Sequence, residues 1–187
     1  MEQKIAMMLV SLLMKGPNHA RALAKSLGIN HMTAMRALKS LVDENILDYS
    51  VMGRNKVFHL KSTVEARDAI LMAELHRLDL ILEQYPSLRR IVAQILDDER
   101  VQLAVLFGSF AKGTAKKDSD IDLYVETVDP VVKKDLMRLS SKLSVKVGGY
   151  DRESPLIKEI EKDHVIIKGV EIFYRYQKLL KGVQEVS

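Results

Sequence analysis

Hydrophobic residues recur at helical spacing along the front half of the chain and divide it into five predicted helices. The first covers residues 2–15 and stops at Gly16-Pro17, a pair that ends helices. Asn18 is expected to cap the second, residues 19–27, and the third starts at Ile29-Asn30. A long helix over residues 63–84, capped by Ser62 or Thr63, precedes another from Pro86 to about Asp98.

Alternating and short apolar patterns predict the strands. Residues 48–60 alternate across Gly53-Arg54-Asn55, which indicates a β-hairpin, and residues 101–107 form an apolar run typical of a buried strand. Further strands are expected from Asp120 onward and over residues 143–148, with helices from Asp129-Pro130 to about Lys142 and over residues 154–162. Residues 165–176 read as strand-like segments broken at Gly169. The mixture predicts the α+β class.

Composition places the chain among ordinary globular proteins. Its 187 residues are 47% hydrophobic and 29% charged, which indicates neither disorder nor a membrane span. The chain has no cysteine, and its five histidines stand without ligand spacing, so neither disulfides nor a zinc site is expected. We expect a reduced, cytoplasmic setting, because the apolar run after Lys4 fits a first helix better than a signal peptide.

Positive charge is concentrated at the front of the chain. Residues 1–62 hold nine Lys and Arg against four Asp and Glu, whereas the rest is nearly neutral. This asymmetry favours a nucleic-acid-binding module ahead of a neutral partner domain.

The candidate chemistry lies between Gly108 and Asp122. Gly108-Ser109 follows the apolar strand directly, and a glycine there lets a phosphate approach the backbone while the serine adds a hydroxyl. Lys112, Lys116 and Lys117 surround this turn with positive charge. Asp120 and Asp122 alternate with apolar residues on the next strand, so both should face one side, roughly 6–7 Å apart at the backbone. That span suits magnesium with its oxygen ligands.

The segments Gly108–Gly113 and Ser119–Leu123 resemble the G-S-x-A-x-G and S-D-I-D-L signature of the DNA polymerase β nucleotidyltransferase superfamily, and most closely its minimal nucleotidyltransferases. The resemblance implies a mixed sheet with flanking helices, phosphate binding by Gly108 and Ser109, with Lys112 beside them, and catalytic magnesium ligation by Asp120 and Asp122. It also implies transfer of a nucleotidyl group from a nucleoside triphosphate, expected to be ATP, to an acceptor hydroxyl. A P-loop is excluded, because no lysine follows Gly113.

One residue departs from the family pattern. The family sets a third carboxylate on the strand that corresponds to residues 143–148, and Lys146 occupies that place. A lysine there could neutralise the aspartates and cannot act as a general base in its cationic form. Glu126 and Asp151 are weak substitutes. Whether the protein is an active enzyme is therefore open.

Residues 33–47 resemble the recognition helix and exit of winged helix-turn-helix regulators, with Asn45 where that family often has glycine. The resemblance implies contacts to double-stranded DNA, for which the chain offers a helix face and a hairpin wing. The expected contact residues are His31, Thr33, Arg36, Lys39, Arg54 and Lys56. A winged helix used only for protein contact is the alternative.

The long helix over residues 63–84 has more apolar positions than one face needs, so it packs either on a second subunit in a homodimer or within the chain.

These patterns predict three parts: a winged helix-turn-helix DNA-binding domain (1–62), a helical connector (63–98) and a nucleotidyltransferase-like domain (99–187). The first function expected is magnesium-dependent nucleotidyl transfer, with a protein among the acceptors considered. The alternative is a catalytically weak or inactive transcription regulator or antitoxin that senses nucleotide or binds a toxin protein.

Overall fold

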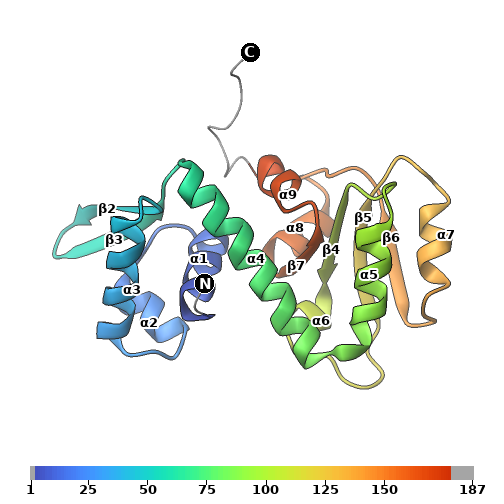
Figure 1. Cartoon of the computed structure of the whole chain (residues 1–187), viewed down its shortest axis with the longest axis horizontal. Coiled ribbons are helices and arrows are strands. Elements are labelled where there is room, and N and C mark those ends of the chain that lie inside the picture. Colours follow the sequence, from blue (N-terminus) through green and yellow to red (C-terminus); the bar gives the residue numbers. More distant parts are fainter. Residues whose placement is uncertain (1–2, 178–187) are drawn as a thin grey trace, which may run out of the picture. The chain divides into compact units, whose positions relative to one another are not determined.

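The computed structural model describes residues 3–177 of the chain, which form two compact units (Figure 1). Unit 1 comprises the described residues up to His76 together with Gln177, and unit 2 comprises Arg77–Tyr176. The division falls within one long helix, α4 (Val64–Gln84). No helix in the described part is long and apolar enough to cross a membrane.

Unit 1 consists of three helices, a hairpin and the first half of α4. The elements are α1 (Gln3–Lys15), β1 (Asn18–His19), α2 (Ala20–Ser26), α3 (His31–Asp43), β2 (Leu47–Met52) and β3 (Asn55–Leu60). β2 and β3 pair antiparallel around a turn at Gly53 and Arg54, as the alternation predicts, and β1 adds to the outer edge of β3. The apolar faces of the helices and Phe58 of the hairpin form one buried core.

The termini of these helices follow local hydrogen bonding. Asn30 caps α3 by accepting a hydrogen bond from the Met32 amide (2.7 Å), and Thr63 caps α4 through the Ala66 amide (3.2 Å). The prediction that Asn18 caps α2 was wrong. Nδ1 of His19 accepts from the Ala22 amide (3.1 Å) instead, because Asn18 is held in β1 opposite Phe58.

Unit 2 is a four-stranded mixed sheet with helices on both faces (Figure 1). Its strands are β4 (Leu103–Phe107), β5 (Ile121–Glu126), β6 (Leu143–Val147) and β7 (His164–Lys168), in the order β6-β5-β4-β7. β6 runs parallel to β5, and the other two pairs are antiparallel. The helical elements are η1 (Pro86–Leu88), α5 (Arg89–Asp97), α6 (Gly108–Ala111), α7 (Val132–Met137), α8 (Pro155–Lys162) and α9 (Val170–Tyr176). The predicted mixed α+β architecture is confirmed.

The two faces of this sheet differ in chemistry because successive side chains on a strand alternate. One face is entirely apolar: Ile121, Leu123 and Val125 of β5 pack with α5 and α7 in the main core. The other face of β5 carries Asp122, Tyr124 and Glu126. Tyr124 is buried there and donates a hydrogen bond to the Gly148 carbonyl (2.8 Å).

The structure of unit 2 corrects two of the predicted elements. Residues 170–176 form helix α9 and not a strand, because the buried Phe173 and Tyr174 fall at helical spacing from Val170 after the turn at Gly169. Burial makes these two rings core residues. The helix predicted from Asp129-Pro130 to Lys142 is also shorter, since α7 ends at Met137.

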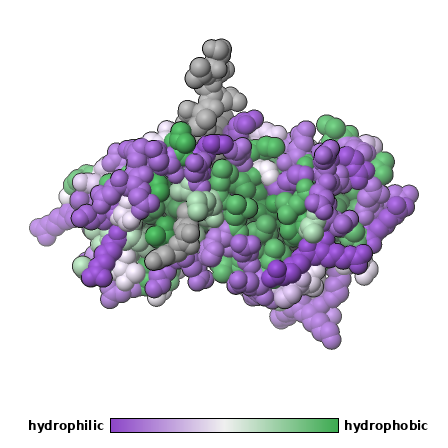
Figure 2. All heavy atoms as spheres, viewed as in Figure 1, coloured by the Kyte–Doolittle hydropathy of each residue, from purple (hydrophilic) through white to green (hydrophobic). Residues whose placement is uncertain are grey.

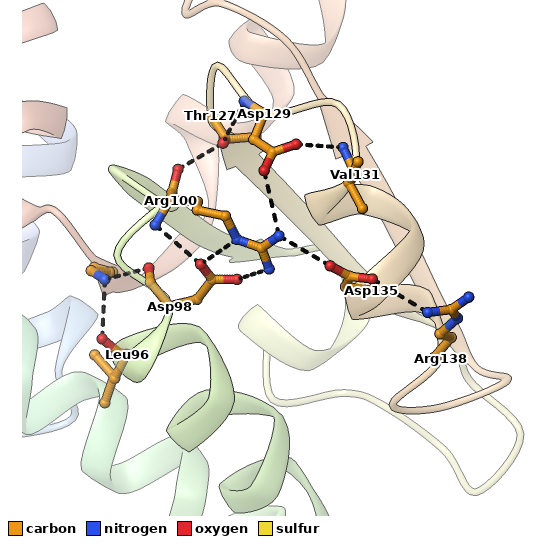
Figure 3. Close-up of polar contacts among 9 residues, drawn as sticks. Leu96, Asp98, Arg100, Thr127, Asp129, Val131, Asp135 and Arg138 are labelled. Carbon is orange, nitrogen blue, oxygen red and sulfur yellow. Dashed lines mark hydrogen bonds and ion pairs between the residues drawn. The ribbon is translucent and has the colours of Figure 1, made fainter.

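A polar cluster around Arg100 fixes the entry to β4 against α7 (Figure 3). Its guanidinium donates to both carboxylate oxygens of Asp98 (2.9 and 2.8 Å), to Asp135 (3.1 Å) and to Asp129 (3.4 Å). The hydrogen bonds to Asp98 and Asp135 raise the pKa of Arg100, and the hydrogen bond from Arg100 lowers the pKa of Asp98. Three carboxylates thus share one cation and hold the loop after β5 in place.

Gly169, between β7 and α9, is predicted to tolerate no side chain. Its φ is +81°, and a Cβ added there would lie 2.5 Å from the Gln102 carbonyl oxygen, a backbone atom that cannot move aside. Gly169→Ala should lower the free energy of unfolding by at least about 2 kcal/mol in chemical denaturation. Gly149→Ala is the control, because nothing lies within 4 Å of its added Cβ, and should change stability by less than about 0.5 kcal/mol. Equal stability of both variants would contradict the geometry.

Candidate functional site

The bend after β4 passes directly over the carboxylate of Asp122. β4 and β5 pair so that Phe107 stands opposite Asp122, and the chain then reverses at Gly108 with a φ of +69°. A Cβ on Gly108 would lie 2.5 Å from Oδ2 of Asp122. Only glycine therefore allows the backbone of the bend to approach this carboxylate, in addition to favouring the left-handed conformation.

The negative charge of Asp120 acts on Asp122. Asp122 is half-buried and Asp120 is exposed just before β5. Burial raises the pKa of Asp122, and the negative charge of Asp120 raises it further. A hydrogen bond from Ser144 and the charge of Lys146 lower it, whereas Glu159 of α8 raises it. The effect of Asp120 on the pKa of Asp122 is consistent with two carboxylates on the same side of the chain, as the alternation of polar and apolar residues predicts.

The strand register places Ser144, and not Lys146, beside Asp122. In the parallel pair of β5 and β6, Ser144 stands opposite Asp122 and Lys146 opposite Tyr124. Lys146 is exposed, and no ion pair joins it to Asp120 or Asp122 within the described residues. Its influence on Asp122 is the weakest of the five that shift this pKa. Lys146 therefore does not fill the space between the two aspartates.

The proposed substitutes for a third carboxylate are engaged elsewhere. Glu126 accepts a hydrogen bond from the Tyr176 hydroxyl (2.9 Å), and Asp151 accepts from the Glu153 amide (3.0 Å) in its own turn. Besides Asp120, the acid that influences the pKa of Asp122 is Glu159, which sequence reasoning missed. No motif marks it, because α8 comes near β5 only through the fold.

A magnesium ion fits the donor set when part of its coordination comes from a ligand. Among residues 3–177 no three side chains of His, Asp or Glu are grouped to hold a metal. Asp120 and Asp122 supply two hard oxygen donors, and magnesium is commonly bound through one or two carboxylates together with phosphate oxygens and water.

The predicted nucleotide-binding residues Ser109 and Lys112 and the further lysines expected around the bend separate into two groups. Ser109 is half-buried in α6, and Lys112 is exposed at its end. No side chain caps the first turn of α6. Lys116 and Lys117 line a pocket on the apolar side of β5. The positive charge that the sequence places around the bend is thus divided between both faces of the sheet.

In unit 1, the predicted contact residues lie on α3 and on the hairpin. α3 buries Ala34, Leu38 and Leu41. His31, Arg36 and Lys39 are exposed, and Thr33 is half-buried. Arg54 stands in the exposed hairpin turn, and Nζ of Lys56 lies 3.9 Å from the centroid of the Tyr49 ring. Many hydrophilic residues gather at the hairpin end of unit 1, at the left of the view (Figure 2), where Val51 and Met52 of β2 are exposed as well.

The mixed sheet, the glycine bend and the paired carboxylates of unit 2 are consistent with a nucleotidyltransferase domain. A family model described as nucleotidyltransferase domain matches residues 87–183. Since this match spans more than half of the 187 residues, the chain belongs to that family.

Among solved structures, the chain is similar to one described as "Crystal structure of the toxin-antitoxin with AMP-PNP". The identity is 20% and the TM-score 0.34, with 48% of this chain and 87% of that chain covered. At this level the likeness carries no argument about function. No curated protein matches the chain.

The charges around Asp122 generate a prediction for its titration. Asp120→Asn should lower the pKa of Asp122 because it removes a neighbouring negative charge, and Ser144→Ala should raise it because it removes a hydrogen bond to the ionised form. Titration of the carboxyl carbon by ¹³C NMR measures both. Asp118→Asn, an exposed acid that does not shift this group, is the control. Shifts of the same sign in the first two variants would show that the site is arranged differently.

Proposed function

We propose that unit 2 binds a nucleoside triphosphate with magnesium and transfers its nucleotidyl group to an acceptor hydroxyl. The observation that carries this proposal is the close approach of the Gly108 backbone to Asp122, where an added Cβ would lie 2.5 Å from Oδ2, which sets a glycine bend beside the carboxylate pair. The family match supports the same class of reaction.

Each residue has a role that follows from its position. The backbone at Gly108 and the Ser109 hydroxyl hold phosphate oxygens, and Lys112 adds positive charge nearby. Asp120 and Asp122 hold the magnesium ion, which would neutralise phosphate charge and orient the scissile bond. The acceptor oxygen then forms a bond to the α-phosphorus while the bond to the pyrophosphate leaving group breaks. The acceptor's proton leaves to water or to Glu159, the remaining acid that influences Asp122.

A nucleotide sensor without turnover is the second candidate, and the composition of β6 favours it. This strand contains no Asp or Glu, so the base that the family uses is absent there. Such a protein would act as a transcription regulator or an antitoxin whose contacts respond to bound nucleotide.

A labelling assay tests the proposed nucleotidyl transfer. The protein is incubated with magnesium, nucleoside triphosphates labelled at the α-phosphate, and candidate acceptors that include the protein itself. We expect label in an acceptor, and a loss on the order of 10²-fold or more in Asp120→Asn and Asp122→Asn. Gly108→Ala should abolish transfer. Gly113→Ala is its control, because it has the same φ of +69° and its added Cβ meets only the flexible end of Gln84.

Calorimetry with a non-hydrolysable triphosphate separates the outcomes. Binding that Asp122→Asn removes, without any transfer by the native protein, would favour the sensor. Absence of both binding and transfer would contradict both candidates.

We infer for unit 1 that it is a winged helix that binds double-stranded DNA. Support comes from the order of three helices and a hairpin, with α3 and the hairpin turn both presenting exposed cations. Arg36 has no ion pair within the described residues, so it is available for a phosphate or base contact.

Electrophoretic retardation of the promoter region of its own gene measures this binding. Arg36→Ala and Arg54→Ala should each weaken it by roughly tenfold, and binding should fall steeply with salt. Lys15→Ala, an exposed cation at the end of α1, is the matched control and should have a smaller effect. Unchanged affinity in both arginine variants would refute the assigned surface.

A further inference from the structure

A second pocket lies within unit 2 on the side of β5 that faces away from Asp122. Its volume is about 470 Å³, and its floor is formed by Ile91, Phe110 and Ile121 of the main core. Because side chains alternate along β5, Ile121 points into this pocket while Asp122 points to the opposite face. Neither the glycine bend nor either aspartate lines it. The pocket is therefore distinct from the proposed transfer site.

Four cations surround this pocket without a counter-charge. They are Arg90 of α5, Lys116 and Lys117 of the loop after α6, and Lys142 before β6. No Asp or Glu lines the pocket, and no carboxylate pairs with these four side chains within residues 3–177. Arg100 of the same unit differs, since three carboxylates surround it. Positive charges that line one hollow without a paired carboxylate attract an anion.

The loop that carries two of the lysines is fixed before any ligand arrives. The Ala115 amide donates to the Tyr85 hydroxyl (3.1 Å), and the Lys116 amide donates to Oγ of Ser119 (2.9 Å). The ammonium of Lys142 donates to the Lys117 carbonyl. Tyr85 is itself held by an edge contact with the Phe110 ring, with 4.9 Å between centroids. A site ordered in this way loses little conformational entropy on binding.

The lining selects a ligand with a flat apolar part and a phosphate. Phe110, Leu139 and the ring of Tyr85 provide apolar and aromatic contact, while the cations and the hydroxyls of Ser87 and Ser140 suit phosphate oxygens. The volume lies in the range of small-molecule pockets. A hollow with an apolar floor also differs from the extended basic groove that follows a polynucleotide backbone.

We propose that this pocket is a second nucleotide site, which binds a nucleoside monophosphate or diphosphate without a metal ion. Its ligand contacts Ser119, the residue next to Asp120. The site stands independently of the transfer reaction, because it uses none of the residues assigned to that reaction.

Calorimetric titration of the full chain with AMP and ADP in the presence of EDTA tests the proposal, because EDTA removes metal-dependent binding at the aspartates. We expect saturable binding that Arg90→Ala combined with Lys116→Ala weakens at least tenfold. The matched control combines Arg89→Ala with Lys133→Ala, two exposed cations that do not line the pocket, and should change the affinity less than twofold. Asp120→Asn combined with Asp122→Asn should also leave it unchanged.

The position of the ligand is measured separately. Amide chemical shifts in ¹⁵N NMR should change on addition of AMP at Ser87, Ala115 and Ser140, and remain unchanged at Gly108. Three results would overturn the assignment: no binding at millimolar nucleotide, equal weakening by the control pair, or loss of binding in the aspartate variants. Inorganic phosphate that binds as tightly as AMP would exclude a ring-bearing ligand, and selective binding of a single-stranded oligonucleotide would assign the surface to nucleic acid instead.

Discussion

The close approach of the Gly108 backbone to the Asp122 carboxylate determines the arrangement of unit 2. It requires β4 and β5 to pair with Phe107 opposite Asp122, and it requires a residue without Cβ at a φ of +69°. A shift of the pairing by one residue would turn Asp122 into the apolar core and bring Ile121 out to the bend. The burial of Ile121 and Leu123 therefore maintains the geometry of the polar face, although neither residue contacts a ligand there.

This arrangement divides β5 into two chemically different surfaces. One side presents acids beside a glycine bend, and the other presents an apolar floor ringed by cations. Ser119, Asp120 and Ile121 are consecutive, so the two surfaces are connected through a single turn of the backbone. A ligand bound on the cationic side would contact Ser119, directly before Asp120, which itself lies just before the strand.

The sequence predicted correctly those helices and strands whose formation depends on residues close together in the chain. Alternation located the hairpin, apolar spacing located α1 and α4, and Asn45 indeed adopts a φ of 64°, the left-handed conformation that asparagine tolerates. The errors share a different cause. Asn18 does not cap α2, because it pairs in a strand with Phe58, 40 residues later in the sequence. α9 forms because Phe173 and Tyr174 are buried. The register that sets Ser144 beside Asp122, and the approach of Glu159, also arise from packing between distant segments.

The groups around Asp122 limit what chemistry this site can perform. Burial and the charge of Asp120 hold its pKa above the usual range, so the pair favours a bound cation that relieves the repulsion. Under the proposed function the two carboxylates would hold a metal ion that in turn binds phosphate, whereas activation of an acceptor would need a further base. β6 supplies a serine and a lysine in place of that base. Under the proposed function the acceptor's proton would pass to water or to Glu159 of α8, so nucleotide binding and turnover in this site have different requirements.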